Sequence, residues 1–258
     1  MTTLLIEALQ FGFANHDKVV NDFHLQAGSG EIVCLLGASG CGKTTVLNLI
    51  AGLLKPSGGK IELSGKKAGS ETGIDVGYIF QTDALFPWRT VEGNLLLASD
   101  LNPAFNRAKA REKMEQYLEV FHLQGSVLKK YPSQLSGGMR QRVSIIQTLM
   151  FEPELILLDE PFSALDYYTK LSLEEEFCQL VRKQGKTAVM VTHDIEEAVA
   201  MADRAYIMNG GKLESEFIIR SPQKDGAESV NEARGSSVFA EHYRLIWKEL
   251  KQVVGSKD

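Results

Sequence analysis

The sequence predicts an α/β protein built on a mainly parallel sheet, and three observations indicate this fold class. Short apolar runs of strand character alternate with amphipathic helical stretches, as in a parallel sheet covered by helices. A glycine-rich segment, Gly37–Thr45, follows one such strand and precedes a helix. Two carboxylates, Asp159 and Glu160, follow another strand. Because ligands of α/β sheets bind at the carboxyl ends of the strands, we expect the chemistry at that edge.

The first third of the chain contains a run of strand patterns and one helix. Alternating and apolar runs predict strands, and Val46, Leu47, Leu49, Ile50 and Leu53 have helical spacing before a Pro-Gly stop. The predicted strands are Leu4–Ala8, Val19–Gln26, Ile32–Leu36, Lys60–Leu63 and Gly77–Phe80, and the predicted helix is Lys43–Leu54.

The middle of the chain, from about Thr82 to Met150, has a helical pattern. Ala108–Phe121 is a charged amphipathic stretch, and Gly138–Met150 is a second helix. Strand patterns lie on both sides of this region, so the sequence predicts a helical lobe inserted into the sheet domain.

The last third of the chain returns to strands and then becomes polar. Leu155–Leu158 and Thr187–Val191 predict buried strands, and Ala205–Met208 and Leu213–Phe217 flank the hairpin signal Asn209-Gly210. Asp194-Ile195-Glu196-Glu197 predicts a helix start. The polar run Ser221–Ser237 predicts a linker or loose surface segment, and Val238–Leu250 predicts a closing helix.

Composition narrows the class of protein. With 258 residues, of which 44% are hydrophobic and 24% charged, the chain is of the globular type. The net charge of −5 argues against a broad nucleic-acid-binding surface. No apolar run approaches the roughly 20 residues that span a bilayer, and the polar start does not resemble a signal peptide. We therefore expect the chain in the cytoplasm, with Cys34, Cys41 and Cys178 as reduced thiols that form neither a disulfide nor a zinc site.

Gly37–Thr45 fits the phosphate-loop pattern G-x-x-x-x-G-K-[ST]. In this pattern glycine lets backbone N–H groups converge on phosphate oxygens at a helix N-terminus. An ordinary glycine-rich turn is disfavoured by the strand before the segment and the helix after it. We expect Lys43 to bridge the β- and γ-phosphates, Thr44 to ligate Mg²⁺ and Cys41 to offer only its backbone. The residues predicted to bind ATP here are Gly37, Ala38, Ser39, Gly40, Cys41, Gly42, Lys43, Thr44 and Thr45.

Four polar residues at strand ends complete the predicted catalytic set. Mg-ATP chemistry needs a carboxylate near the metal and a second group that orients the attacking water. We assign Asp159 to the metal and Glu160 to the water, although an acidic pair at a strand end is more often a solvated loop. His193 can hold the water in line at the γ-phosphate, or it is a helix-cap neighbour. Gln81 is expected to link Mg²⁺ to movement of the helical lobe, or it simply ends a strand.

A second glycine motif lies at Leu135–Arg142 and has the sequence Leu-Ser-Gly-Gly-Met-Arg-Gln-Arg. It has no role in binding the nucleotide that the phosphate loop of the same copy holds. Its presence is explained if two copies of the chain associate head to tail and the motif of each copy completes the ATP site of the other. This arrangement predicts a homodimer that forms with ATP.

Together with the phosphate loop, Gln81, Asp159-Glu160, Ser163–Asp166 and His193, this motif makes the chain resemble the ATP-binding cassette (ABC) ATPases over about residues 4–220. The resemblance implies a RecA-like P-loop NTPase fold with an N-terminal antiparallel β part and an inserted α-helical subdomain. It implies a nucleotide-binding domain at 1–220, with a catalytic core at 1–81 and 151–220 and a helical subdomain at 82–150, followed by a linker and helix at 221–258.

The resemblance also implies roles for residues outside the phosphate loop. Ser136, Gly137 and Gly138 are expected to contact the γ-phosphate held by the partner copy, and Asp166 to lie at the dimer seam. An aromatic residue upstream of the phosphate loop stacks on adenine in this family. Phe13 is the best match by position and Phe11 is the competitor; either residue could instead belong to the core.

A narrower resemblance rests on Phe80–Val91 and Glu160–Asp166, which look like the ATPases of nitrate, sulfonate and taurine importers. It implies two permease subunits or a permease dimer, an extracytoplasmic solute-binding protein, a place at the cytoplasmic face of the membrane, and a docking role for Phe86-Pro87-Trp88. Two stretches depart from the usual sequence of this branch. Ile146-Gln147 replaces Ala-Arg, and Tyr167-Tyr168-Thr169-Lys170 replaces Ala-Gln-Thr-Arg.

Three other functions remain as alternatives. They are an exporter subunit, a non-transport cassette ATPase that remodels soluble partners, and a nucleotide-dependent scaffold without meaningful turnover. The combination of Asp159, Glu160 and His193 disfavours the scaffold. The resemblance implies that selectivity for the transported compound belongs to the permease and the solute-binding protein.

Overall fold

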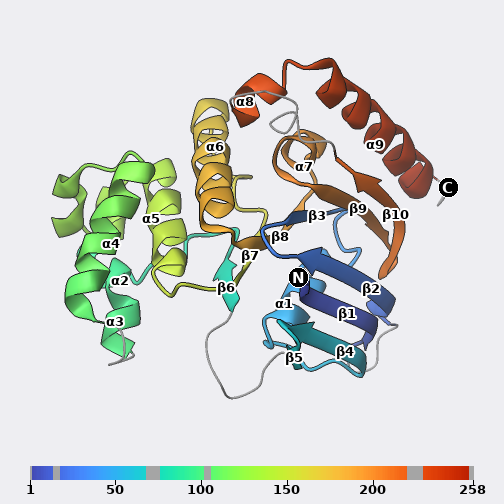
Figure 1. Ribbon diagram of the computed structural model, residues 1–258, viewed down its shortest axis with the longest axis horizontal. Helices are drawn as coiled ribbons and strands as arrows, with labels where there is room; N and C mark the ends of the chain where they lie inside the picture. Colours follow the sequence, from blue (N-terminus) through green and yellow to red (C-terminus); the bar gives the residue numbers. More distant parts are fainter. Residues whose placement is uncertain (1, 14–17, 68–75, 102–105, 220–228, 256–258) are drawn as a thin grey trace.

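The computed structural model describes residues 2–13, 18–67, 76–101, 106–219 and 229–255. Within these residues the chain forms two sheets surrounded by helices (Figure 1). The four-stranded sheet is antiparallel and has the order β2-β1-β4-β5. Its strands are β1 (Thr2–Phe11), β2 (Val20–Gly28), β4 (Gly58–Leu63) and β5 (Lys66–Lys67).

The six-stranded sheet has the order β10-β9-β3-β8-β7-β6, and all of its neighbouring pairs are parallel except β10 with β9. The two sheets confirm the predicted α/β class, with a mainly parallel sheet and an N-terminal antiparallel part. The strands of the six-stranded sheet are β3 (Ile32–Leu36), β6 (Val76–Ile79), β7 (Leu155–Asp159), β8 (Thr187–Thr192), β9 (Arg204–Asn209) and β10 (Lys212–Ile218).

Each face of the parallel sheet packs into its own apolar core. Successive residues of a strand point to opposite faces, so Ile32, Cys34 and Leu36 of β3 join one core, whereas Val33 and Leu35 join the other. The second core lies between the parallel sheet, α1 (Lys43–Ile50) and the antiparallel sheet. Because all five side chains of β3 are fully buried, the phosphate loop that follows this strand starts from a fixed point.

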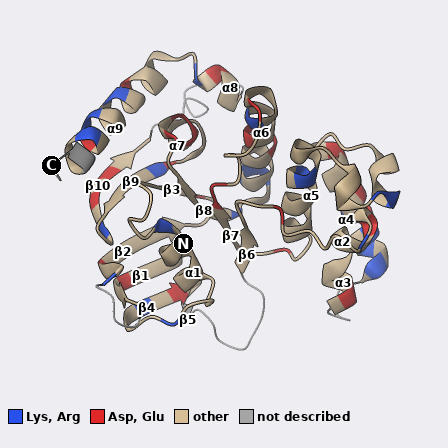
Figure 2. Cartoon of the chain, turned by 180° about the vertical axis from the view of Figure 1, so that it is seen from behind, with Lys and Arg blue, Asp and Glu red and all other residues tan. Residues whose placement is uncertain are grey.

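A group of helices follows β6 and lies to one side of the sheets (Figure 1). Asn106 caps α4 and Ser136 caps α5 through their side-chain oxygens, a typical start for a helix. Both signs of charge are interspersed on α4, as expected for a helix with one face in solvent (Figure 2). These helices are α2 (Val91–Leu95), α3 (Leu97–Leu101), α4 (Arg107–Val120) and α5 (Gly137–Leu149), with 3-10 turns at Gly125–Lys129 and Pro132–Gln134.

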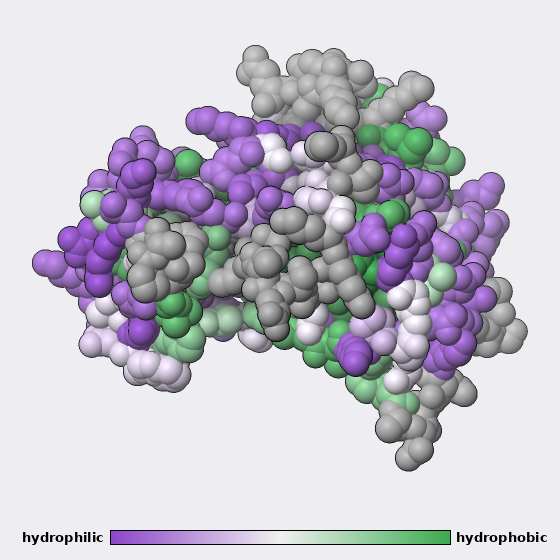
Figure 3. Space-filling view, turned by 60° about the horizontal axis from the view of Figure 1, so that its bottom comes forward, coloured by the Kyte–Doolittle hydropathy of each residue, from purple (hydrophilic) through white to green (hydrophobic). Residues whose placement is uncertain are grey.

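The remaining helices are α6 (Tyr167–Gln184), α7 (Ile195–Met201), α8 (Val230–Ala233) and α9 (Ser237–Gly255). They cover the face of the parallel sheet that is opposite α1. Hydrophobic atoms are visible on the surface where the helical group meets the sheet part (Figure 3). Within the described residues, none of the helices is sufficiently long and apolar to traverse a membrane.

The structure differs from the predicted elements in four places. The helix expected to reach Leu54 ends at Ile50, because Gly52 takes a left-handed φ of 72° and Leu53 is exposed. The loose segment predicted for Ser221–Ser237 contains α8, because Val230 and Ala233 are buried and Ser229 caps the turn. Residues 220–228 of that segment lie outside the described residues. Helix α6 and the short strand β5 were not predicted from the sequence.

Candidate nucleotide site

The phosphate loop connects β3 to α1, as predicted. Gly40 and Gly42 have left-handed φ angles of 80° and 106°, which favour glycine. A Cβ added at Gly42 would lie 2.8 Å from the carbonyl oxygen of Val19, so the backbone here leaves no room for a side chain. The Nζ atom of Lys43 is buried and donates hydrogen bonds to the carbonyl oxygens of Gly37 (2.8 Å) and Ala38 (3.0 Å). The backbone of the phosphate loop therefore wraps around the side chain of Lys43 and is held by these two hydrogen bonds.

The oxygen atoms expected at a magnesium ion lie together. The hydroxyl of Thr44 donates a 3.0 Å hydrogen bond to Oδ1 of Asp159, and the hydroxyl of Tyr78 lies 3.4 Å from Oδ2. Burial raises the pKa of Asp159, whereas the hydrogen bonds from Thr44 and Tyr78 oppose this shift. A hydroxyl and a carboxylate beside a phosphate loop are the hard oxygen ligands that Mg²⁺ takes. The residues present therefore fit the ion.

Glu160 and His193 face each other from neighbouring strand ends. Nδ1 of His193 lies 3.0 Å from Oε2 of Glu160, and the imidazole is largely exposed. The backbone N–H of Glu160 donates to the carbonyl of Val191 (3.0 Å), which anchors the carboxylate to β8. The φ of Glu160 is 46°, which is uncommon for a residue with a Cβ and is found preferentially at functional sites.

A hollow of about 440 Å³ lies over the phosphate loop and reaches Glu160, whereas Asp159 and His193 are not among the described residues that line it. Phe13 lines it and has 48% of its side chain exposed, whereas Phe11 is buried and packs edge-on against Phe13 with ring centroids 4.9 Å apart. Phe11 therefore belongs to the core, and Phe13 is the aromatic residue that is open to a ligand. The other lining residues are Val19, Ser39, Gly40, Gly42, Lys43, Thr44, Thr45 and Glu160.

The second glycine motif lies elsewhere. Within the described part of the chain, Ser136, Gly137 and Gly138 are not among the residues lining the hollow. The side-chain oxygen of Ser136 accepts a hydrogen bond from the N–H of Met139 (3.3 Å), and the two glycines open helix α5. Gly138 lies against Thr169 of α6, and a Cβ at Gly138 would be 2.5 Å from Thr169 Cγ2. This close approach ties the motif to the start of α6.

Two predicted residues lie near the site without touching the phosphate loop. The amide of Gln81 makes a long hydrogen bond of 3.4 Å to the hydroxyl of Ser163. Asp166 caps α6 by accepting from the N–H of Thr169 (3.1 Å), and hydrogen bonding from Thr169 lowers the pKa of Asp166. Gln81 is thus tied to the Ser163–Asp166 loop rather than to Asp159 in this structure.

Sequence reasoning missed two residues that support the site. Tyr78 reaches Asp159 from β6, and its placement follows from period-two alternation along a strand. Lys170 of α6 forms ion pairs of 2.6 Å with both Asp194 and Glu197, which flank the start of α7. No local pattern joins residues that are 24 and 27 positions apart, so only the structure reveals this contact.

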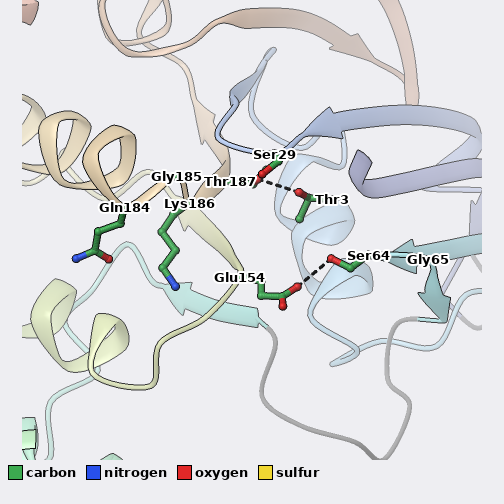
Figure 4. A pocket seen from close by; sticks show the side chains of 9 residues that line it. All are labelled: Thr3, Ser29, Ser64, Gly65, Glu154, Gln184, Gly185, Lys186 and Thr187. Carbon is green, nitrogen blue, oxygen red and sulfur yellow. Dashed lines mark hydrogen bonds between the residues drawn. The ribbon is translucent and has the colours of Figure 1, made fainter. Parts of the chain in front are cut away.

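A further hollow, of about 530 Å³, lies at the opposite edge of the sheet, before β7 and β8 begin (Figure 4). Its polar side chains are paired: Ser64 donates to Glu154 (2.9 Å), and Thr187 donates to Thr3 (3.1 Å). Lys186 donates to the carbonyl of Pro153 (2.7 Å). We assign no ligand to this hollow.

Comparison with known proteins identifies the family. A family model described as ABC transporter matches residues 20–163, which are more than half of the chain. The chain belongs to the ABC transporter family. Like the other members of this family, it is an ATPase that uses ATP with Mg²⁺.

Two relatives and one solved structure illustrate the similarity. The uncharacterized ABC transporter ATP-binding protein YtlC of Bacillus subtilis (strain 168) is 39% identical over 94% of this chain and 92% of its own length. The aliphatic sulfonates import ATP-binding protein SsuB of the same organism is 43% identical over 76% of each chain. The ATP-binding cassette MJ0796, solved as a dimer bound to ADP and Pi in a post-hydrolysis state, is 28% identical, with a TM-score of 0.74 over 84% of this chain and 99% of that chain.

Proposed function

We propose that this ABC ATPase is the energy-coupling subunit of an importer for a small solute, with a sulfonate-, nitrate- or taurine-like anion as the first class to test. Two copies would enclose two Mg-ATP, close, and drive a membrane permease from the cytoplasmic face. We treat residues 1–220 as the nucleotide-binding domain, with the helical subdomain at 82–150. The similarity to the sulfonate import protein supports this choice over the exporter and non-transport alternatives.

The observation that carries the hydrolytic part of the proposal is the contact between Glu160 and His193 beside the phosphate loop. In the proposed reaction a water oxygen attacks the γ-phosphorus, the bond from that phosphorus to the bridging oxygen of ADP breaks, and Glu160 receives a proton from the water. His193 and Lys43 hold phosphate oxygens. Thr44 and Asp159 would hold Mg²⁺, which supplies positive charge against the phosphates when bound.

The placement of Ser136–Gly138 away from the hollow supports a second copy as part of the site. The backbone N–H groups of Gly137 and Gly138, at the start of α5, form an anion-binding end. Their own phosphate loop does not use them, so a γ-phosphate held by another copy is the ligand that suits them. When the second copy closes against this end of α5, the contact of Gly138 with Thr169 would transmit the movement to the Ser163–Asp166 loop.

An apolar groove of about 290 Å³ lies between β6 and the helical group and supports docking of a permease helix. Phe80, Phe86, Leu97 and Phe151 line it, and Trp88 beside it has 72% of its side chain exposed. An exposed aromatic residue beside an apolar groove is typical of a protein interface.

Asn94 holds the loop beside this groove in place. The side chain is fully buried, accepts from the N–H of Phe86 (2.8 Å), and donates to the carbonyls of Phe86 (3.1 Å) and Thr90 (3.0 Å). The amide of Gln147, near the end of α5, donates to the same asparagine (3.3 Å). Helix α5 therefore connects the docking loop to Ser136–Gly138 at its other end, which is the connection that coupled transport requires.

The proposal is tested by isolating the tagged chain from native membranes in mild detergent and identifying what co-purifies. A multi-span permease that is lost with Trp88→Ser but retained with Trp247→Ser would support the importer assignment. Trp247 is the matched control, since it is the other tryptophan of the chain and is also exposed. Uptake of sulfonate, nitrate and taurine by the recovered complex in vesicles would then test the solute class. Recovery of only ribosomal or other non-membrane partners would contradict the transport role and leave the ATPase chemistry intact.

A further inference from the structure

We propose that Arg234, in the C-terminal segment of the chain, is a positioning residue for His193. It would act by holding α6 and α7 together, and it would thereby fix the backbone from which the imidazole projects. This inference rests on the proposed role of His193 in ATP hydrolysis. It gives a function to a segment that the family match, residues 20–163, does not include.

Arg234 directly follows α8, and its guanidinium reaches acidic residues on two other helices. One partner is Glu174 of α6, whose side chain is fully buried and which Arg234 contacts directly through Nη2. The other is Glu196 of α7, whose Oε2 lies 3.4 Å from Nη1 of Arg234. The side chain of Arg234 is itself only 12% exposed. A single buried cation therefore bridges α6 and α7.

The C-terminal segment holds Arg234 in a fixed place. The backbone N–H of Asn231 donates to Glu175 of α6 (3.2 Å), and Val230 and Ala233 are buried. The guanidinium lies over the ring of Phe239, 6.0 Å from its centroid, and α9 packs along α7. In the ribbon views, α8 lies at one end of α6 (Figures 1 and 2). These contacts make the arginine an anchored group rather than part of a loose tail.

The same helix pair is joined beside His193. Lys170 of α6 contacts Asp194 and Glu197 at 2.6 Å each, and the hydroxyl of Thr192 donates to Glu197 at 2.5 Å. Asp194, the residue after His193, caps α7 by accepting from the N–H of Glu196 (2.8 Å). The backbone on both sides of His193 is thus set by where α7 lies relative to α6.

Loss of Arg234 removes one of these two connections and leaves a buried carboxylate without its cation. Breaking a buried pair in this way is unfavourable, because the buried carboxylate loses the cation that offsets its burial. Glu174 and Glu197 already repel each other, and Lys170 is the other cation that acts on Glu174. We expect α7 to move relative to α6 and to carry His193 away from its contact with Glu160.

The experiment compares Arg234→Ala and Arg234→Lys with Arg244→Ala in the full chain. Arg244 is the matched control, because it lies in the same segment and is exposed. We expect Arg234→Ala to lower kcat for ATP hydrolysis about tenfold, within the range caused by small displacements of a positioned catalytic group, with KM for ATP unchanged. Arg234→Lys should restore part of kcat, because it keeps the charge but not the two-pronged geometry. Arg244→Ala should behave as the parent.

A second measurement does not depend on activity. The chain has five histidines, so the imidazole Hε1 signal of His193 can be assigned in an NMR spectrum by its loss in His193→Ala. We expect this signal to shift in Arg234→Ala, to shift less in Arg234→Lys, and to keep its position in Arg244→Ala. Folded Arg234→Ala with parental kcat and an unshifted His193 signal would overturn the inference.

Two further variants separate the remaining outcomes. If Arg234→Ala does not fold, the double variant Glu174→Gln/Arg234→Met removes both charges of the buried pair and still lacks the link to Glu196, so the same loss of kcat and the same shift are expected. Parental behaviour of the double variant would also overturn the inference. If His193→Ala itself retains full turnover, the proposed role of His193 fails. If His193→Ala is inactive while Arg234→Ala is unaffected, only the positioning role fails.

Discussion

The imidazole Nδ1 of His193 lies 3.0 Å from the carboxylate Oε2 of Glu160. These residues follow β8 and β7, which are neighbours in the parallel sheet, so the pairing of two strands creates the contact. With Nδ1 engaged by the carboxylate, Nε2 is the ring nitrogen left to face a substrate. The phosphate loop after β3 is adjacent on the other side of β8.

Glu160→Gln should keep ATP affinity and lose turnover. Glutamine preserves the size and the polar contacts of the side chain but cannot accept the proton of the attacking water, so we expect kcat to fall about 100- to 1,000-fold. Phosphate release measures the rate, and gel filtration with ATP should detect a trapped dimer. Glu154→Gln is the control, because Glu154 precedes the same strand at its other end. Normal turnover in Glu160→Gln would exclude this residue as the key carboxylate.

Lys43→Ala should lose nucleotide binding rather than chemistry alone. The buried ammonium group is held within the phosphate loop by two carbonyls. If it binds a phosphate oxygen as proposed, its loss should lower ATP affinity about 10- to 100-fold, as for loss of a charged hydrogen bond. Calorimetric titration with ATP measures the change. The exposed Lys55, altered to Ala in parallel, provides the comparison. An unchanged affinity for ATP would count against the assignment of the loop.

Gly138→Ala should destabilise the chain, and Thr169→Ser should rescue it. The new Cβ would lie 2.5 Å from Thr169 Cγ2, a methyl group that serine lacks. Overpacking of this kind costs about 1–3 kcal/mol of unfolding free energy. At Gly137 a Cβ meets nothing closer than 4.0 Å, so Gly137→Ala should leave stability unchanged. Thermal unfolding of the single and double variants checks both statements, and a Gly138→Ala variant as stable as the parent would refute the contact.

Glu174→Gln should change how stability depends on pH. Burial raises the pKa of Glu174 from 4.5 to about 7, against the lowering effect of Arg234 and Lys170 and with a raising contribution from Glu197. As pH rises from about 4.5 to 7, the unfolded chain releases this proton before the folded chain does, so the contribution of Glu174 to stability is lost over this window.

Glutamine has no such proton. The unfolding free energy of Glu174→Gln relative to the parent should therefore rise by up to about 3 kcal/mol between pH 5 and pH 8. Denaturant titrations of both proteins across this range measure the difference. A difference that stays constant with pH would show that Glu174 does not titrate there.

Much of the nucleotide site could be predicted because its residues follow apolar strands. Lys43, Asp159, Glu160 and His193 each come after a run that is recognisable as a strand, and parallel strands bring their carboxyl ends to one edge. The alternation pattern could not separate Phe11 from Phe13, which are two residues apart. Their difference depends on where β1 ends, since Phe11 is its last residue and is buried.

The contacts between helices could not be predicted from the sequence. Lys170, Glu174 and Arg234 lie in polar stretches that are typical of solvated faces, and the ion pairs that bury them join residues as many as 60 positions apart. The predicted loose segment was wrong over α8 for the same reason, because its few apolar residues become buried only against α6 and α7. Arg182 shows the same limit, since its partner Asp203 follows α7.

The left-handed backbone of Glu160 affects how the chain would respond to selection for heat resistance. A side chain with a Cβ at φ 46° costs about 1 kcal/mol or more relative to an ordinary conformation, and glycine or asparagine accepts this conformation at a lower cost. A screen for thermal stability alone would therefore favour Glu160→Gly or Glu160→Asn, and both variants lack the proposed catalytic carboxylate. The most heat-resistant descendants of this chain would include inactive ones, and an engineering campaign has to select for ATP turnover at every round.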